Sequence, residues 1–187
     1  MSKLKLLPLL ALLAGCQPSG PVLPMSSPAA FRQQATPITT MPLTAKVADN
    51  EAWRLAQQWA AEAHLTHVLG RSITASGQPH ASSGSWTFSF IDQQNPQKAL
   101  QIVFRVKSKP LMRRLSTQQL SQPEPLEIRA WGLDSDRAVL KAKEFFGQVS
   151  LRQMELTRDP DGRLIWSFDG KPLLDAMHGL PYQPLKR

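Results

Sequence analysis

The stretch Ser85-Trp86-Thr87-Phe88-Ser89-Phe90 alternates aromatic side chains with small polar ones. Successive side chains of a β-strand point to opposite faces, so this order places three aromatic rings on one face. A second alternation runs from Leu100 to Lys107, where the apolar residues occupy the even positions. Turn residues between Asp92 and Gln97 separate the two stretches. Together they predict an antiparallel hairpin with one buried face and one wet face.

The second half of the chain repeats this plan. Leu164, Trp166 and Phe168 alternate after the turn sequence Asp159-Pro160-Asp161-Gly162, and a strand is expected before that turn, from about Val149 to Thr157. Trp86-x-Phe88 and Trp166-x-Phe168 are therefore matching strand patterns. The tail from Lys171 is expected to fray.

A helix is predicted ahead of each group of strands. In the first, Asp49 is a candidate N-cap, and small or aromatic residues recur on one face until the helix ends near His64. A strand from Leu65 to Ile73 follows. In the second, Ser135 caps the helix and Gly147 ends it. Its apolar face is expected to contain Ala138, Val139, Ala142, Phe145 and Phe146.

Two less regular segments lie between these groups. Residues 108–125 contain Pro110, Pro123 and Pro125 and are expected to form a polar connector. A short extended piece from Leu126 to Trp131 follows it.

This arrangement resembles PepSY-type domains and, more broadly, cystatin-like modules of exported bacterial proteins. The resemblance covers roughly Asp49 to Gly170, and the residues that carry it are Ala52-x-x-x-Ala56-x-x-Trp59, Ser85-Trp86-x-Phe88-x-Phe90, Leu133-Asp134-Ser135-Asp136-x-Ala138 and Ile165-Trp166-x-Phe168. It implies an α+β fold of two helix-on-antiparallel-sheet repeats, over residues 48–110 and 111–187. It also implies a module that restrains peptidases or acts in envelope regulation, and it supplies no catalytic residue.

The N-terminal residues predict export and lipid attachment. Lys3 and Lys5 precede an apolar run from Leu4 to Leu13 that is too short to span a bilayer as a helix. Leu13-Ala14-Gly15-Cys16 resembles the lipobox of bacterial lipoproteins. This resemblance implies cleavage between Gly15 and Cys16, diacylglycerol on the Cys16 sulfur and an acyl chain such as palmitate on its amino group. A secretory signal with a chance cysteine is the alternative.

Residues 1–15 are thus expected to be a signal peptide and 16–47 a lipidated cysteine with a proline-rich, disordered tether. We expect a cell-envelope location with the membrane as one partner. In the bacterial lipoproteins that this segment resembles, Asp after the lipidated cysteine signals retention at the inner membrane. Gln17 takes that place here, so the resemblance favours the outer membrane if the organism has one. The sequence leaves inner and outer membrane open.

Composition limits the remaining function classes. The 187 residues contain one cysteine, so no internal disulfide can form. Loss of Lys3 and Lys5 with the signal lowers the formal net charge from +8 to +6, which favours an anionic surface or an acidic partner. No nucleic-acid motif is present, and we expect no nucleic-acid partner.

Candidate chemical sites are incomplete in the sequence. His64 and His67 have a helical i, i+3 spacing but lack nearby ligands that would complete a zinc site. Ser83-Gly84-Ser85 is better explained as the entry to a strand than as a nucleophile motif. Asp159-x-Asp161-Gly162 lacks the later ligands of a calcium loop. We therefore expect no enzyme activity, catalytic residue, metal or cofactor.

Five basic residues without an intervening acid form the remaining candidate site: Arg105, Lys107, Lys109, Arg113 and Arg114. A solvated strand face is the plain interpretation, and a docking patch for anionic lipid or an acidic partner is the functional one. The sequence favours a non-catalytic module that binds a protein or peptide. A bound peptide could add a strand at an edge of the sheet. Restraint of a peptidase would be one such function. The alternatives are a structural or assembly lipoprotein of an envelope complex and, less favoured, an envelope enzyme.

Overall fold

The computed structural model describes residues 43–121, 123–126 and 131–184. Within them the chain forms two α-helices, a short 3-10 helix and seven strands. In chain order these are α1 (Ala45–Trp59), β1 (Ala63–Arg71), β2 (Ser85–Asp92), β3 (Asn95–Phe104), β4 (Leu111–Ser116), η2 (Thr117–Gln119), α2 (Ser135–Phe146), β5 (Gln153–Arg158), β6 (Leu164–Phe168) and β7 (Lys171–Asp175).

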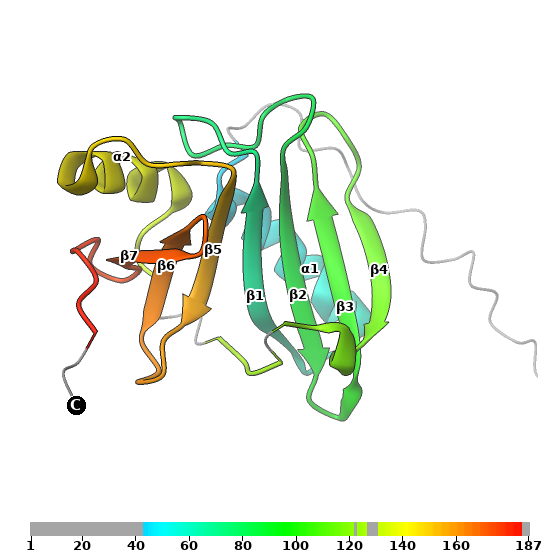
Figure 1. Cartoon of the computed structure of the whole chain (residues 1–187). Coiled ribbons are helices and arrows are strands. Elements are labelled where there is room, and N and C mark those ends of the chain that lie inside the picture. The colour runs from blue at the N-terminus through cyan, green and yellow to red at the C-terminus, as the bar shows by residue number, and fades with distance from the viewer. Residues whose placement is uncertain (1–42, 122, 127–130, 185–187) are drawn as a thin grey trace, which may run out of the picture. The chain divides into compact units, whose positions relative to one another are not determined.

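The seven strands form one antiparallel sheet in the order β4-β3-β2-β1-β5-β6-β7 (Figure 1). The α+β class and the Ser85–Phe90 hairpin strand are confirmed. A single sheet results because β1 pairs with β5, from Val68 opposite Leu156 to Arg71 opposite Gln153. Helix α1 lies behind β1 to β4 in Figure 1 and packs on β1, β2 and β3, whereas α2 packs against β7.

The first helix begins five residues earlier than the sequence predicts. Thr44, and not Asp49, is the N-cap, and its side chain accepts a hydrogen bond from the Val47 amide. Asp49 instead lies within the helix and is buried, with 8% of its surface exposed. The helix ends at Trp59, and Ala60 has an extended backbone. The chain must straighten here to enter β1, whose buried residues pair in the centre of the sheet, so tertiary pairing overrides the helix propensity of the alanines.

The N-termini of the two helices meet. The N-cap of α2 is Asp134, one residue before the predicted Ser135. Asp134 Oδ1 accepts hydrogen bonds from the amides of Lys46 (3.0 Å) and Ser135 (2.6 Å). Ser135 Oγ accepts from the Ala45 amide at 2.9 Å and donates to the carbonyl of Gly77 at 2.7 Å. The N-cap and the first residue of α2 thus satisfy amides that α1 cannot satisfy within its own first turn.

Buried tryptophans join the two groups of strands. The Trp86 and Trp166 side chains are both fully buried. Trp86 Nε1 donates to the Leu43 carbonyl at 3.0 Å, and Trp166 Nε1 donates to the Leu133 carbonyl at 2.9 Å. Gly70 lies opposite both Trp86 and Met154 in the sheet. A Cβ atom at Gly70 would stand 2.3 Å from the Trp86 ring, so only glycine fits there.

Several predicted boundaries differ from the structure. The connector expected over residues 108–125 contains the strand β4, whose Leu111, Arg113 and Leu115 alternate with Met112 and Arg114. The predicted fraying tail from Lys171 contains β7, which pairs with β6. The strand expected from Val149 begins at Gln153. For β4 and β7 a partner strand supplies stabilisation that the local sequence pattern cannot reveal. Strand β5 begins at Gln153 because its pairing with β1 starts there, with Gln153 opposite Arg71.

Some predictions concern residues outside the described part of the chain. The signal peptide, Gly15, Cys16 and the tether up to residue 42 lie there, as do residues 127–130 of the expected extended piece. Among the described residues, neither helix is long and apolar enough to cross a membrane.

Candidate docking site

Strand β4 is an edge of the sheet. Its six residues pair on one side with β3, from Leu111 opposite Val103 to Ser116 opposite Lys98. No described strand pairs with its other side. The backbone N–H and C=O groups that point outward from β4, which we call the β4 edge, can therefore accept an added strand.

The opposite edge of the sheet is covered. A bridge joins Leu174 of β7 to Pro181, the Asp175 amide donates to the Leu180 carbonyl at 2.9 Å, and the Tyr182 amide donates to the Leu173 carbonyl at 2.8 Å. The C-terminal segment thus occupies the outer side of β7. Within the described residues, β4 is the edge available for pairing.

The five predicted basic residues gather at this edge but do not share one face. Arg105, Lys107 and Lys109 lie in the turn that joins β3 to β4, because β3 ends at Phe104 and not at Lys107 as the alternation predicted. Lys107 has a φ angle of 58°, which reverses the chain direction and stops the strand. The structure leaves all five side chains exposed: Arg105, Lys107, Lys109, Arg113 and Arg114.

The two arginines of β4 point to opposite faces of the sheet. Arg113 lies opposite Gln101 and Arg114 lies opposite Leu100, and neighbouring residues of a strand alternate between faces. From Gln93 to Pro123 the chain contains no acidic residue, so the potential along β3 and β4 is positive. An extended acidic chain placed beside β4 would meet a cation on each of its faces.

The predicted histidine pair has a different setting. His64 and His67 lie on β1 and not at a helix end. A bulge between Leu65 and His67 shifts the pairing with β2, so His64 opposite Ile91 and His67 opposite Ser89 fall on the same face. Burial lowers the pKa of His67, although the charge of Glu155 acts to raise it. Among the described residues, no three potential metal ligands are grouped.

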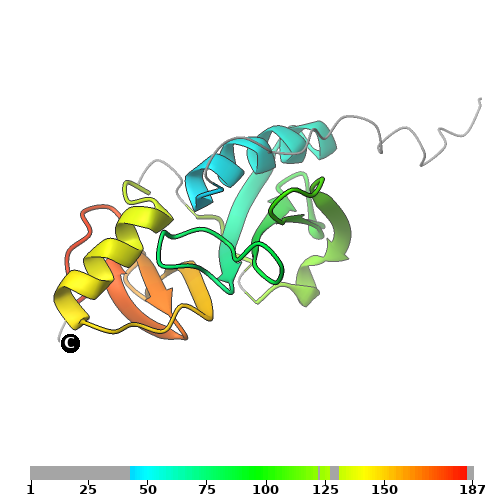
Figure 2. The ribbon, with the colours of Figure 1, turned by 90° about the horizontal axis from the view of Figure 1, so that it is seen from above.

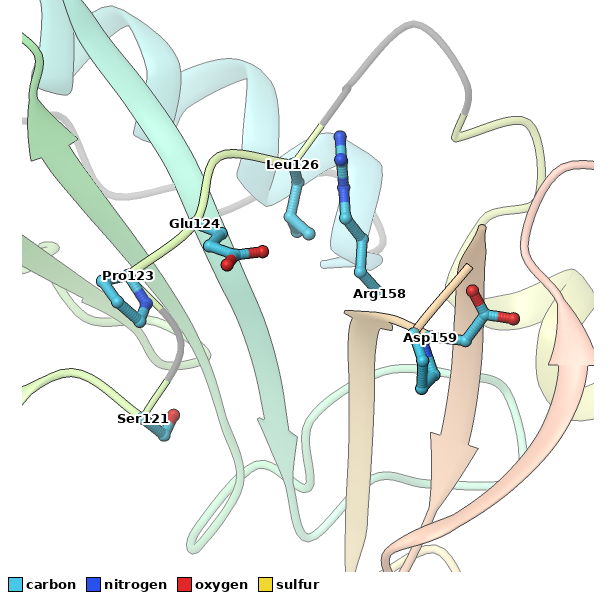
Figure 3. A pocket seen from close by; sticks show the side chains of 7 residues that line it. Ser121, Pro123, Glu124, Leu126, Arg158 and Asp159 are labelled. Atoms are coloured by element: carbon cyan, nitrogen blue, oxygen red, sulfur yellow. The ribbon is translucent and has the colours of Figure 1, made fainter. Parts of the chain in front are cut away.

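A cavity of about 370 Å³ lies between the connector and the β5–β6 turn. Figure 3 shows Glu124 and Leu126 on one side of it and Arg158 on the other. Arg158 Nε is buried and has no hydrogen-bond partner among the described residues. The lining contains neither histidine of β1, so the cavity does not assemble the predicted histidines with carboxylates.

The Asp159 turn has a structural role. Its carboxylate points away from the connector in Figure 3 and accepts hydrogen bonds from the Arg163 amide (2.8 Å), Arg163 Nε (3.0 Å) and the Tyr182 hydroxyl (3.1 Å). Burial acts to raise the pKa of Asp159, but these hydrogen bonds hold it below its ordinary value. The residues of the incomplete calcium pattern thus fasten the C-terminal segment to the β5–β6 hairpin.

The structure exposes two aromatic residues that the helical pattern assigned to the core. Ala138, Val139 and Ala142 of α2 are fully buried, but Phe145 and Phe146 are 41% and 43% exposed. The helical spacing of apolar residues does not show where a helix extends past the sheet on which it packs. Two adjacent phenylalanines directly before a helix-ending glycine were the available signal.

Comparisons with known proteins bear on the fold. A scan against protein-family models finds no match, and a search of curated proteins finds none either. Among solved structures, the chain is similar to the crystal structure of a "putative lipoprotein" from Clostridium difficile 630, with a TM-score of 0.52 and 11% sequence identity. The similarity covers 82% of this chain and 95% of that one. It shows a shared fold, while the resemblance to PepSY-type domains and to the lipobox stays a prediction.

Proposed function

We propose that this chain is a lipid-anchored envelope protein that binds an extended acidic segment of a partner protein beside β4. The segment would add an eighth strand to the sheet. One observation carries this proposal: β4 is an edge strand with no described partner on its outer side, and it is surrounded by cations.

The backbone of the β4 edge would supply most of the affinity. An added strand satisfies outward N–H and C=O groups, and each such hydrogen bond contributes about 1 kcal/mol net. Leu111, which is 46% exposed, lies on this strand and offers an apolar contact to a side chain of the added segment. Alternate side chains of the added segment would then contact the protein on the two faces of the sheet.

The cations would select the ligand and speed its arrival. Edge strands that carry charged side chains are protected from pairing with copies of themselves, because like charges repel. The same charges attract an acidic strand, and their effect falls as salt screens them. The basic residues therefore serve both to prevent self-association and to recognise the partner.

The lipid anchor supports a binding role at the envelope. The Cys16 lipobox and the proline-rich tether would hold the folded unit near a membrane while leaving it free to reorient. The structural neighbour bears the name of a lipoprotein and shares the fold, which is compatible with an outer-membrane or inner-membrane position. Restraint of a peptidase is one use of such a module, since an added strand occupies the extended form in which a substrate peptide would bind.

We also infer that the two halves are structural repeats of the PepSY type. Residue Leu43 precedes α1 by two positions, and Leu133 precedes α2 by two positions. Each carbonyl accepts a hydrogen bond from the indole of the Trp-x-Phe strand of the same half. A shared hydrogen bond at matching positions supports common descent of the halves better than sequence pattern does.

The binding proposal is tested with a ten-residue peptide that alternates Glu and Val, and with a copy whose alternate amides are N-methylated. Fluorescence anisotropy with the full chain in detergent should show binding of the first peptide that weakens as salt rises. The methylated copy should lose binding, because methylation removes the donors that strand addition needs. Equal binding of both peptides would contradict strand addition.

A charge-reversal pair tests the site. The double variant K109E/R113E should bind the peptide about tenfold or more weakly, since two attractive pairs become repulsive. The matched control R137E/K171E makes the same change in net charge with two exposed residues on α2 and β7, and should bind as the unmodified chain does. Equal losses in both variants would show that net charge, and not the β4 edge, attracts the peptide.

The anchor is tested separately by mass spectrometry of the chain recovered from membranes. The expected N-terminal residue is Cys16 carrying diacylglycerol, and the variant C16S should leave the membrane fraction. An intact, unmodified Met1 would overturn the anchor without affecting the peptide result.

A further inference from the structure

We propose that the last turn of α2, with Phe145 and Phe146, docks on the anionic surface of a lipid bilayer. We call these two residues the phenylalanine pair. This proposal deepens the function proposed above: the lipid anchor suggests which surface is close by, and docking would set the orientation of the β4 edge.

The phenylalanine pair is exposed at a place where helical geometry would normally bury it. At about 100° per residue, both side chains continue the face that Ala138, Val139 and Ala142 bury. The two rings nevertheless keep 41% and 43% of their surface exposed and pack on each other, with centroids 6.3 Å apart. In Figures 1 and 2 the last turn of α2 lies on the side of β5 to β7 away from β1 to β4.

One cation contacts the pair, and two more lie near it in the sequence. Lys141 Nζ lies 5.5 Å from the centre of the Phe145 ring, Lys143 is in the last helical turn, and the Arg152 side chain is 91% exposed. Two of these cations also have acidic partners: Lys141 Nζ lies 2.8 Å from Glu144 Oε2, and Arg152 Nε lies 3.7 Å from Asp169 Oδ2. The three cations and two acids leave a net positive charge of one. Helices that lie in the interfacial region of an anionic bilayer typically insert phenylalanine or leucine side chains and keep lysine or arginine beside the headgroups.

The chain length allows this contact. The hydrogen bond from the Ala45 amide to Ser135 Oγ places the start of the folded unit at the N-terminal end of α2. The phenylalanine pair lies one helix length away, about 18 Å for a helix of this size. Residues 17–42 supply 26 residues of chain between Cys16 and the described part, and a chain of that length can reach at most about 85 Å when fully extended. A lipidated Cys16 in the bilayer therefore leaves the last turn of α2 free to reach the same surface.

Docking would direct the β4 edge away from the membrane. Helix α2 packs against β7, and β4 is at the other end of the strand order. Six strand spacings separate these two edges, which corresponds to about 29 Å. A partner segment could then reach β4 without approaching the bilayer.

The test uses full chain carrying C16S, so that no lipid anchor contributes, and vesicles of phosphatidylcholine with or without 30% phosphatidylglycerol. Cosedimentation should show binding to the anionic vesicles. The variant F145S/F146S should lose at least tenfold in affinity. The control L140S removes an apolar side chain that is 56% exposed on the opposite side of the same helix, and it should bind as C16S alone does.

A second measurement remains informative if the double serine variant folds poorly. In the C16S background F146C supplies the single cysteine of the chain, which can carry an environment-sensitive fluorophore. Anionic vesicles should shift its emission to the blue, whereas the same label at L140C should shift little. Equal shifts at both positions, or equal vesicle binding of F145S/F146S and L140S, would overturn the proposal.

Two further outcomes would also overturn membrane docking. If light scattering shows that the chain forms a dimer that F145S/F146S dissociates in the absence of vesicles, the pair is a self-association surface and the proposal fails. If vesicles do not bind while the Glu-Val peptide still binds at the β4 edge, membrane docking fails and the proposed function stands.

Discussion

The indole ring of Trp86 contacts that of Trp166 edge to face, with centroids 6.3 Å apart and planes inclined at 61°. One ring stands on a strand that follows α1 and the other on a strand that follows α2. The contact therefore connects the first half of the core to the second. Trp131 adds a further edge contact to Trp166, at 5.9 Å.

The two tryptophans should differ in their contribution to stability. The structure shows one indole donor, Trp86 Nε1, for the Leu43 carbonyl. The Leu133 carbonyl accepts hydrogen bonds from two indoles, those of Trp166 and Trp131. Replacement W86F should therefore lower the free energy of unfolding by about 3 kcal/mol and W166F by about 2 kcal/mol, because only the former leaves a buried carbonyl without a donor. Urea unfolding followed by far-ultraviolet circular dichroism measures both. A larger loss for W166F would contradict this explanation.

Replacement G70A should destabilise the protein through the Trp86 ring. The new Cβ would be 2.3 Å from that ring and 2.9 Å from the Ile73 side chain, and overpacking of this kind costs about 1–3 kcal/mol. In a W86F background the smaller ring should give way, so G70A should cost less there than in the unmodified chain. A double-mutant cycle of unfolding free energies tests this, and strictly additive losses would show that Gly70 is required for another reason.

Asp49 should make the protein less stable as pH rises. Burial raises its pKa from 3.8 to about 7, and the charge of Asp134 adds to this while Lys46 opposes it. Its Oδ1 atom has no hydrogen-bond partner among the described residues. Between pH 4 and pH 7 the folded state holds a proton that the unfolded state has lost, so stability falls through that range, by about 1.4 kcal/mol for each pKa unit at most.

Replacement D49N removes this titration. The variant should lose little at pH 4 and be more stable than the unmodified chain at pH 8, as measured by urea unfolding across that range. A D49N variant that keeps the full slope would assign the titration to another group.

The local sequence pattern predicted those helices, strands and turns that are determined mainly by residues within a few positions of one another. The Trp-x-Phe strands, the turn at Asp159 and the second helix all appear close to their expected positions, because alternation, capping and turn residues are encoded within a few positions. The first helix shows the limit of this reasoning. Asp49 has the side chain of an N-cap, but Thr44 also has one, and the choice depends on a residue ninety positions away, Ser135, which accepts from the Ala45 amide.

Long-range pairing hid the strands that matter most for the candidate site. The sequence around Leu111 to Ser116 contains Arg113 and Arg114 and follows a proline, so it was expected to be a connector. It is a strand because β3 provides a pairing partner, and its charges are tolerated because the edge faces solvent. The basic residues were found from sequence, but the unpaired backbone beside them could not be.

The C-terminal segment should prevent self-association at the second edge of the sheet. It covers β7 through the Asp175 and Tyr182 amides, and it is held there by the Tyr182 hydroxyl on Asp159 Oδ2 (3.1 Å) and by the Arg163 guanidinium on the Gln183 carbonyl (3.1 Å). Deletion of residues 180–187 would leave the outer backbone groups of β7 open. This strand carries exposed Lys171 but also apolar Leu173, so charge protects it less than it protects β4.

Light scattering at rising protein concentration should therefore show more self-association for the truncated chain than for the full chain. Y182F serves as control, since it removes one hydroxyl but leaves the segment in place, and it should behave as the full chain does. The same increase in both variants would place the protection in the hydroxyl bond alone, and no increase in the truncated chain would mean that an uncovered β7 does not pair.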